Sequence, residues 1–329
     1  MAVKKTSVVI VGAGGMSRWH VGCMYKMGGA VRVAGFVEPS EKSREAMAGH
    51  VKGDCGQAKV PPFYNTLEEF LAAQGPADCA LIASPHNQHL AQAVACMEAG
   101  MDVLVEKPMV LNAAEARRAM KARDATGRLL SIAFNGSYSP ALQKAKEMIA
   151  AGAIGKVVSI NVMAVQDWVE PTAGTWRQVE KISGGGFLID SGSHAVNSMI
   201  ELAGADVREL RALQDNRGAP VELTSAIAGR FANNVYFTLF TEGVARTNLN
   251  RITVVGMDGL LHTNIYGAFL RVQMAGSWEE KPVELPESQG VFAQFLRVRG
   301  GEIPNPSPAE VGLRFAKFMD MVRKAVGKS

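Results

Sequence analysis

The sequence predicts an α/β protein with two domains of different construction. Its 329 residues exceed the roughly 250 to 300 residues at which a single hydrophobic core stops growing. Up to about residue 134, strand-like and helix-like segments alternate, which is typical of a doubly wound parallel sheet. From about residue 156 onward strand-like runs dominate, and several alternate apolar with polar residues. We therefore expect a doubly wound domain at 1–134 and an α+β domain with an open-faced, mostly antiparallel sheet at 135–329.

Apolar runs and turn residues locate the elements of the first domain. Continuous apolar runs predict buried strands, at residues 6–11, 31–37, 79–83, 101–105 and 129–134. Thr66 and Glu69 form a capping box that starts a helix, and Gly100 ends another. The predicted helices cover residues 16–26, 40–49, 90–99 and 112–127, with one more beginning at 66.

The second domain begins with a helix from Ser139-Pro140 to near Gly152. Its predicted strands are residues 157–165, 208–214, 221–231, 235–241, 250–255 and 268–274. A turn-rich linker at 300–308 leads into a last amphipathic helix at about 308–325, for which packing back on the first domain is one option. The open face of the sheet is a natural subunit contact.

Composition and charge limit which binding partners and which cellular compartment are expected. The formal charge of +4 comes without a basic block, which argues against nucleic acid as a partner. No apolar run reaches the ~20 residues that cross a bilayer, and Val3-Lys4-Lys5 leads directly into the first strand instead of a secretory signal. Four scattered cysteines fit reduced thiols: Cys23, Cys55, Cys79 and Cys96. We expect a cytoplasmic protein with no membrane partner.

A glycine-rich turn follows the first predicted strand and opens the first predicted helix. Gly12 allows the tight turn, Gly14 lets the backbone approach a pyrophosphate, and Ser17 stands where a third glycine is usual. Glu38 ends the second strand, where a carboxylate can hold the ribose hydroxyls of adenosine. This context predicts a Rossmann dinucleotide site. Its expected contacts are Gly12, Ala13, Gly14, Gly15, Met16 and Glu38.

The choice between NAD and NADP depends on the residues after the second strand. Glu38 repels a 2′-phosphate and favours NAD. Ser40, Lys42 and Arg44 follow closely and could bind that phosphate if Glu38 turned away. NAD is the predicted cofactor, with NADP as the alternative.

Two further motifs carry residues suited to proton transfer. Asp190 and His194 are four residues apart after Gly184-Gly185-Gly186, which predicts that they share a face at the start of a helix. A carboxylate there can orient an imidazole that exchanges a proton with a bound hydroxyl. Glu106-Lys107-Pro108 closes a predicted strand, at an edge where this type of sheet binds ligands. The alternative is a helix cap, a core histidine and a simple strand end.

In the order and spacing of these motifs the chain resembles the Gfo/Idh/MocA family, named for glucose-fructose oxidoreductase and inositol dehydrogenase. The likeness covers nearly the whole chain and includes residues 83–89, Phe134-Asn135 and Trp176-Arg177. It implies a Rossmann domain followed by an open-faced sheet through which homodimers or homotetramers form. Two departures leave the substrate open: Asn197 stands where an acid is frequent, and residues 136–138 replace a segment that usually carries arginine.

The resemblance also implies roles for single residues. His194 transfers the proton, Asp190 orients its ring or bonds a substrate hydroxyl, and Lys107 stabilises the reacting oxygen or carries the proton itself. Further cofactor contacts are implied for Ser84, Pro85, His86, His89, Glu106 and Lys107. Substrate contacts are implied for Asn135, Trp176, Arg177 and Asn197. His86 and His89 have no third ligand nearby, so lining the cofactor crevice is favoured over a metal site, and no metal is expected.

Together these features predict an NAD(P)-dependent oxidoreductase. We expect it to transfer hydride between nicotinamide and a secondary alcohol or ketone of a sugar, cyclitol or related polyol. Two alternatives stay open: glycosidase or lyase chemistry through transient oxidation by NAD, and a non-catalytic sensor that binds dinucleotide. A sensor has little need of Lys107, Asp190 and His194 together.

Overall fold

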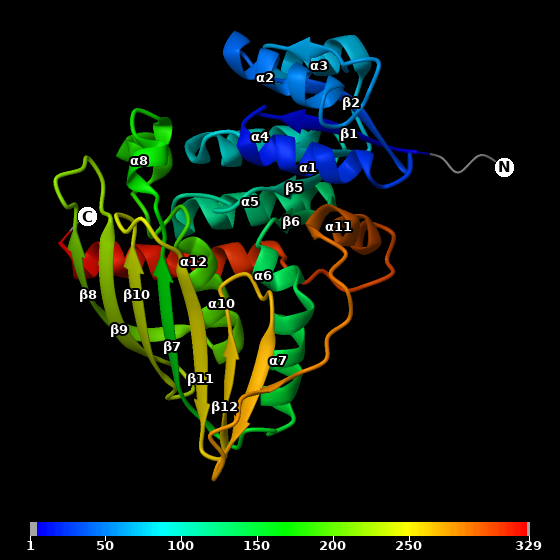
Figure 1. Ribbon diagram of the computed structural model, residues 1–329. Coiled ribbons are helices and arrows are strands. Elements are labelled where there is room, and N and C mark those ends of the chain that lie inside the picture. The colour runs from blue at the N-terminus through cyan, green and yellow to red at the C-terminus, as the bar shows by residue number, and fades with distance from the viewer. Residues whose placement is uncertain (1–4, 328–329) are drawn as a thin grey trace. The chain divides into compact units, whose positions relative to one another are not determined.

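The computed structural model describes residues 5–327 and forms two compact units. Unit 1 comprises Met1–Val110, Ala114–Ala133 and Gly290–Glu310, and unit 2 comprises Leu111–Ala113, Phe134–Gln289 and Val311–Ser329. Figure 1 follows the chain from blue to red through both. Val3 and Lys4, which bear on the expected lack of a secretory signal, lie outside the described residues.

Unit 1 is built on a six-stranded sheet in which all neighbouring strands are parallel. Its strands are β1 (Thr6–Val11), β2 (Val31–Val37), β3 (Phe63–Tyr64), β4 (Cys79–Ile82), β5 (Asp102–Val105) and β6 (Leu130–Ile132). They lie in the order β3-β2-β1-β4-β5-β6, which is the order of a doubly wound Rossmann sheet. Val8, Val9 and Ile10 are fully buried, as expected for a strand covered on both faces. The predicted parallel sheet is confirmed.

Helices alternate with these strands, and one late segment joins them. The helices are α1 (Gly15–Tyr25), α2 (Glu41–Lys52), α3 (Leu67–Gln74), the 3-10 helix η1 (His86–Gln88), α4 (His89–Glu98) and α5 (Ala113–Thr126). Gly290–Glu310 also belongs to unit 1 and contains α11 (Val291–Arg299). Ile132 N donates to Ser307 O at 2.9 Å, and Arg123 pairs with Glu310 at 2.8 Å. These contacts tie the late segment to the first sheet.

Unit 2 contains an eight-stranded sheet that is antiparallel except at its centre. Its strands are β7 (Val157–Val165), β8 (Val207–Asp215), β9 (Thr224–Phe231), β10 (Tyr236–Glu242), β11 (Leu249–Gly256), β12 (Gly259–Thr263), β13 (Leu270–Met274) and β14 (Lys281–Pro282). They lie in the order β14-β13-β12-β11-β7-β10-β9-β8. β7 and β10 pair in parallel, and the other described pairs are antiparallel. The predicted mostly antiparallel sheet is confirmed.

The sequence prediction missed the two-residue strands β3 and β14 and the longer strand β12. Strand β12 has five residues and begins at Gly259, where a Cβ would lie 2.7 Å from Gln273 O of β13. Glycine is depleted in strands, so the residue pattern does not indicate one here. The close approach of β13 explains why glycine is nevertheless used.

Three helices lie along one face of this sheet (Figure 1). They are α7 (Pro140–Ala150), α10 (Ser193–Ala203) and α12 (Ala309–Ala325). Phe318 of α12 contacts Phe237 of β10, with 6.3 Å between ring centroids. Shorter helices occupy the connections: α6 (Asn135–Tyr138), α8 (Val169–Thr172), η2 (Trp176–Gln178) and α9 (Glu180–Ser183).

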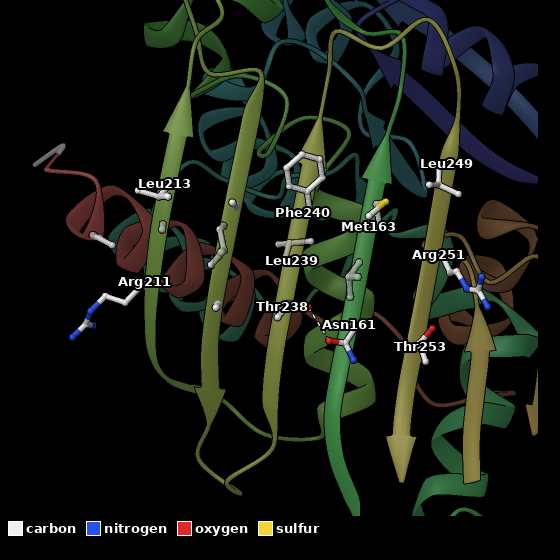
Figure 2. A pocket seen from close by; sticks show the side chains of 16 residues that line it. Asn161, Met163, Arg211, Leu213, Thr238, Leu239, Phe240, Leu249, Arg251 and Thr253 are labelled. Atoms are coloured by element: carbon white, nitrogen blue, oxygen red, sulfur yellow. Dashed lines mark hydrogen bonds between the residues drawn. The ribbon is translucent and has the colours of Figure 1, made fainter. Parts of the chain in front are cut away.

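The opposite face of the sheet exposes apolar side chains. Leu213 is 77% exposed and Tyr236 is 58% exposed. Figure 2 shows Leu213, Phe240, Met163 and Leu249 across this face, around a shallow hollow. Exposed apolar patches mark surfaces suited to contact with another molecule. None of the helices in the described part of the chain is long and apolar enough to cross a membrane.

Candidate active site

The glycine turn joins β1 to α1 with the geometry of a phosphate-binding loop. Gly12 has a φ of +89°, and a Cβ there would lie 2.8 Å from Ala83 O, so only glycine fits. Gly14 is the N-cap of α1 and has no side chain with which to cap the helix. The first N–H groups, in the turn that contains Gly15 and Met16, can therefore receive an anion. The turn could hold a pyrophosphate.

Glu38 follows β2 and is fixed beside this turn. Its carboxylate accepts hydrogen bonds from Ala13 N at 2.8 Å and from Ser40 N at 2.9 Å. Arg44 donates to the backbone oxygen of Glu38 and to Asn65 Oδ1, both at 2.6 Å. Ser40 caps α2. Two of the three residues that could bind a 2′-phosphate are thus engaged by the protein itself.

Lys107 follows β5, and a buried carboxylate holds its backbone. Glu106 is 5% exposed, and its Oε2 accepts a hydrogen bond from Lys107 N at 3.2 Å. Its Oε1 lies 2.8 Å from Nε2 of His20, a fully buried residue of α1. Lys107 is half-buried, and its backbone is linked through Glu106 and His20 to α1, the helix after the glycine turn.

His89 ties together the loops that follow β4 and β5. Its Nδ1 lies 2.8 Å from Pro108 O and its Nε2 lies 2.9 Å from Ser84 O. Both partners are acceptors, so only a doubly protonated ring could donate to both. Burial opposes that charge and lowers the pKa of His89, although the two carbonyls act in the opposite direction. His89 thus connects the loop after β4, which contains Ser84, Pro85 and the buried His86, to the loop after β5. Both ring nitrogens of His89 face backbone oxygens of the protein.

Asp190 lies in a turn and not within a helix. The predicted helix start is wrong by three residues, because α10 begins at Ser193. Asp190 N donates to Gly186 O at 3.2 Å and Gly192 N donates to Phe187 O at 2.8 Å, which winds this segment into irregular turns. Ser193 Oγ donates to Asp190 O at 2.6 Å, so a side chain takes the place of a helical amide.

The glycines before Asp190 allow the backbone to approach a buried glutamate. Glu222 is 3% exposed, and its carboxylate accepts from Gly186 N at 2.6 Å and from Leu188 N at 3.2 Å. A Cβ on Gly186 would collide with the backbone of Glu222, lying 2.9 Å from its carbonyl carbon. The glycine run is therefore a packing requirement of this turn.

The carboxylate of Asp190 binds one predicted substrate residue, Arg177, which in turn contacts a second, Trp176. Its Oδ2 accepts from Trp168 Nε1 at 2.8 Å and from Arg177 Nε at 3.1 Å. The guanidinium carbon of Arg177 lies 4.6 Å from the centre of the Trp176 ring. Asp190 is 4% exposed, so this ion pair lies largely out of water, where charge interactions are stronger.

His194 lies in the first turn of α10 between aromatic rings. It is 8% exposed, and its ring makes an edge contact with Tyr266 at 4.9 Å and with Phe134 at 6.0 Å. The half-buried Asn135, predicted to contact substrate, begins α6 directly after Phe134. The packing fixes the plane of the imidazole.

Asn197 lies about one turn further along α10 and belongs to a buried polar network. Its Nδ2 donates to Ser137 Oγ and to Glu201 Oε1, both at 2.9 Å. Ser137 also donates to Glu201, and Lys146 pairs with Glu201 at 3.2 Å. These contacts fix which way the Asn197 amide points, so its oxygen is the atom available to accept a further hydrogen bond.

Among the described residues, no group of three or more His, Cys, Asp or Glu is placed to hold a metal ion. The rings of His86 and His89 lie 5.7 Å apart, and both nitrogens of His89 already face carbonyl oxygens. The four cysteines, all described, are free thiols.

Family models match both parts of the chain. The model of the oxidoreductase family with an NAD-binding Rossmann fold matches residues 6–134, and that of the GFO/IDH/MocA C-terminal domain matches residues 142–262. The chain belongs to the Gfo/Idh/MocA family. It is thus an NAD-binding oxidoreductase, as the glycine turn and the later motifs predict, and the interpretation as a non-catalytic sensor is set aside.

Named relatives agree with this membership. The chain is 26% identical over 266 residues to oxidoreductase P35 of Formosa agariphila, covering 78% of this chain and 82% of that protein. It is 33% identical over 125 residues to levoglucosan dehydrogenase of Pseudarthrobacter phenanthrenivorans, but these cover only 37% of this chain and 32% of that enzyme. The crystal structure of aldose-aldose oxidoreductase from Caulobacter crescentus matches with a TM-score of 0.82 at 20% identity, covering 98% of each chain. At this identity the structural match shows the fold alone.

Sequence reasoning assigned no site role to three residues that hold predicted site residues or the turn of Asp190 in place: His20, Trp168 and Glu222. Two of them left a signal. His20 belongs to the stripe of α1 with Ser17, Val21 and Met24, and a histidine on the buried side of a helix needs a polar partner. Glu222 interrupts an apolar run, and a buried charge likewise needs partners.

Proposed function

We propose that this oxidoreductase transfers hydride between NAD and a secondary alcohol or ketone of a sugar, cyclitol or related polyol. The supporting observation is the buried Asp190 carboxylate, held by Arg177 and Trp168 with the Trp176 ring against the guanidinium. Such a set offers charged partners for hydroxyls and an aromatic face for a sugar ring. Two of the matched proteins are named for sugars, levoglucosan and aldose.

In this proposal each reacting group of the chain has a defined task. Bound NAD supplies the acceptor for the hydride of the carbinol carbon. Lys107 donates a hydrogen bond to the substrate oxygen and stabilises the negative charge that develops there. His194 accepts the hydroxyl proton, while Asp190 bonds a neighbouring hydroxyl or orients the imidazole. In the alternative assignment, Lys107 accepts the hydroxyl proton in place of His194.

The binding residues are proposed in two sets. The cofactor is contacted by the glycine turn and by the loops after β2, β4 and β5, that is by Gly12, Ala13, Gly14, Gly15, Met16, Glu38, Ser84, Pro85, His86, His89, Glu106 and Lys107. The substrate is contacted by Asn135, Trp176, Arg177 and Asn197. We propose NAD over NADP, because the Glu38 carboxylate is held beside the turn by two backbone amides and would repel a 2′-phosphate.

A substrate screen tests the proposed reaction. The protein is incubated with NAD or NADP and a panel of aldoses, anhydrosugars and cyclitols, and the nicotinamide absorbance is followed. We expect reduction of NAD with at least one member of the panel. Tight NADH binding without turnover of any of them would contradict the proposal. Release of a leaving group without net change in absorbance would indicate the glycosidase or lyase chemistry instead.

We also propose that the open face of the unit 2 sheet joins copies of this chain into a homodimer or homotetramer. The exposed Leu213, Tyr236 and Leu249 support this, since a lone chain would leave them in water. Leu213→Glu should lower the mass measured by light scattering after size exclusion, whereas Glu98→Lys, at an exposed position of α4 in unit 1, should not. The free cysteines support a reducing compartment such as the cytoplasm.

A further inference from the structure

His20 contacts the segment that carries the proposed catalytic lysine, although it lies 86 residues from Glu106 in the sequence. Its Nε2 is 2.8 Å from Glu106 Oε1, and Glu106 Oε2 accepts from Lys107 N at 3.2 Å. His20 is fully buried and Glu106 is 5% exposed. One carboxylate therefore connects α1 to the backbone of the lysine, and it does so in a place where water does not weaken the contact.

The surroundings of the imidazole favour one tautomer. Its second nitrogen, Nδ1, is buried and meets no hydrogen-bond partner among the residues that the structure describes. A proton on Nδ1 would be buried without an acceptor, which is costly. The ring that fits carries its proton on Nε2 and donates it to Glu106.

The helix that bears His20 is itself fixed to the glycine turn. Ser17 Oγ donates to Gly12 O at 2.7 Å, one turn before His20 on the same face of α1. Ser17 and His20 therefore connect α1 to both the glycine turn and Glu106. Through this helix, the residues that would receive the pyrophosphate are linked to the segment of the residue that would meet the substrate oxygen.

We propose that His20 is a positioning residue for Lys107: it orients the Glu106 carboxylate, which holds the Lys107 amide and so fixes where the lysine side chain begins. This inference rests on the proposed function, because it concerns the lysine of that reaction. His20 acts through Glu106 and has no chemical step of its own.

Two amide substitutions separate positioning from simple core filling. In His20→Gln the side-chain amide nitrogen can reach the place of the imidazole Nε2 and still donate to Glu106. In His20→Asn the same amide is one methylene shorter and falls short of the carboxylate. Both variants remove the ring, so a loss of packing alone affects both.

We expect His20→Asn to lower kcat by roughly tenfold or more, the usual size for a lost hydrogen bond to a charged group, with little change in KM. His20→Gln should recover most of the kcat. Amide hydrogen exchange across residues 101–110 should become faster in His20→Asn than in His20→Gln, because the Lys107 amide loses its fixed acceptor.

The inference is overturned if the two variants have equal kcat values and equal exchange rates, or if His20→Asn raises KM alone. The exchange measurement needs no substrate. If it distinguishes the variants while the wild-type protein turns over no polyol, the positioning of Lys107 stands and the proposed reaction fails.

Discussion

Two segments that carry predicted catalytic residues, the Lys107 segment of unit 1 and the Asp190 turn of unit 2, are held in place by different physical means. Around Lys107 the holding groups are titratable side chains: Glu106 on the backbone amide and His89 on the Pro108 carbonyl. Around Asp190 the main requirement is the absence of a side chain at Gly186, which lets the backbone meet Glu222. The Lys107 segment should therefore be sensitive to the loss of polar side chains and to pH. The Asp190 turn should be sensitive to a side chain added at Gly186.

The largest effect expected is on catalysis, from Lys107→Met. This substitution removes the ammonium and keeps a side chain of similar length, so kcat should fall by roughly 10³-fold through loss of charge stabilisation at the oxygen. NADH affinity, measured by fluorescence titration, should change little. Lys121→Met, at an exposed site on α5, is the matched control and should keep full kcat. A Lys107→Met enzyme with normal kcat would remove the lysine from the mechanism.

The next effect concerns stability and tests the glycine arrangement of unit 2. Gly186→Ala should lower the free energy of unfolding by about 3 kcal/mol, because overpacking against backbone cannot relax by a side-chain movement. Gly49→Ala is the control, since a Cβ there meets nothing within 4 Å and alanine is worth up to about 1 kcal/mol in a helix. Chemical denaturation measures both. Equal midpoints for the two variants would show that the turn at Gly186 tolerates a side chain.

A smaller change is expected in cofactor choice. Glu38→Ser removes the carboxylate beside the glycine turn, so affinity for NAD should fall by about tenfold and discrimination against NADP should weaken. Glu45→Ser, at an exposed position of α2, should alter neither. Titration of each variant with NADH and NADPH tests this. An unchanged ratio of the two affinities would mean that Glu38 does not read the ribose.

The smallest effect is a dependence of stability on pH, and it distinguishes the two arrangements. Burial lowers the pKa of His89 below its ordinary value of 6.5. At a pH between the pKa of His89 in the folded chain and its ordinary value, the unfolded chain binds a proton that the folded chain does not. The contribution of the neutral, buried His89 to stability is therefore present above pH 6.5 and is lost as the pH falls through the folded-state pKa. The melting temperature should therefore fall less steeply on acidification in His89→Gln than in the wild type. If the melting temperatures of His89→Gln and the wild type depend equally on pH, this prediction is contradicted. Gly186→Ala is the control and should show the pH dependence of the wild type.

Local pattern predicted most of the fold, because burial on both faces leaves a direct mark on composition. The run at residues 6–11 has no polar alternation and forms β1, whose last four residues are buried. β12 was missed because its first residue, Gly259, is chosen for the approach of β13 and not for strand formation. The start of α10 was placed too early because hydrogen bonds of Gly186 and Ser193 hold Asp190 in a turn.

The candidate site was predictable only where its residues are neighbours in sequence. Spacing indicated Asp190 and His194, and the motif around Lys107 indicated that lysine. Nothing local links His20 to Glu106, or Trp168 to Asp190, because these pairs meet only after the chain has folded. Side chains that hold other side chains are therefore the part of a site that sequence spacing reveals least.

The parallel pairing of β7 with β10 has a consequence for how unit 2 is assembled during synthesis. One antiparallel meander consists of β8, β9 and β10, and another consists of β11, β12 and β13. In each meander, strands that are consecutive in the sequence can pair as soon as the turn between them has formed. β7 emerges earlier and joins the two only by closing a long loop to Tyr236–Glu242, which slows folding. A nascent chain that has not yet exposed residue 242 leaves β7 with two unpaired edges, and this is the interval in which a chaperone would matter most.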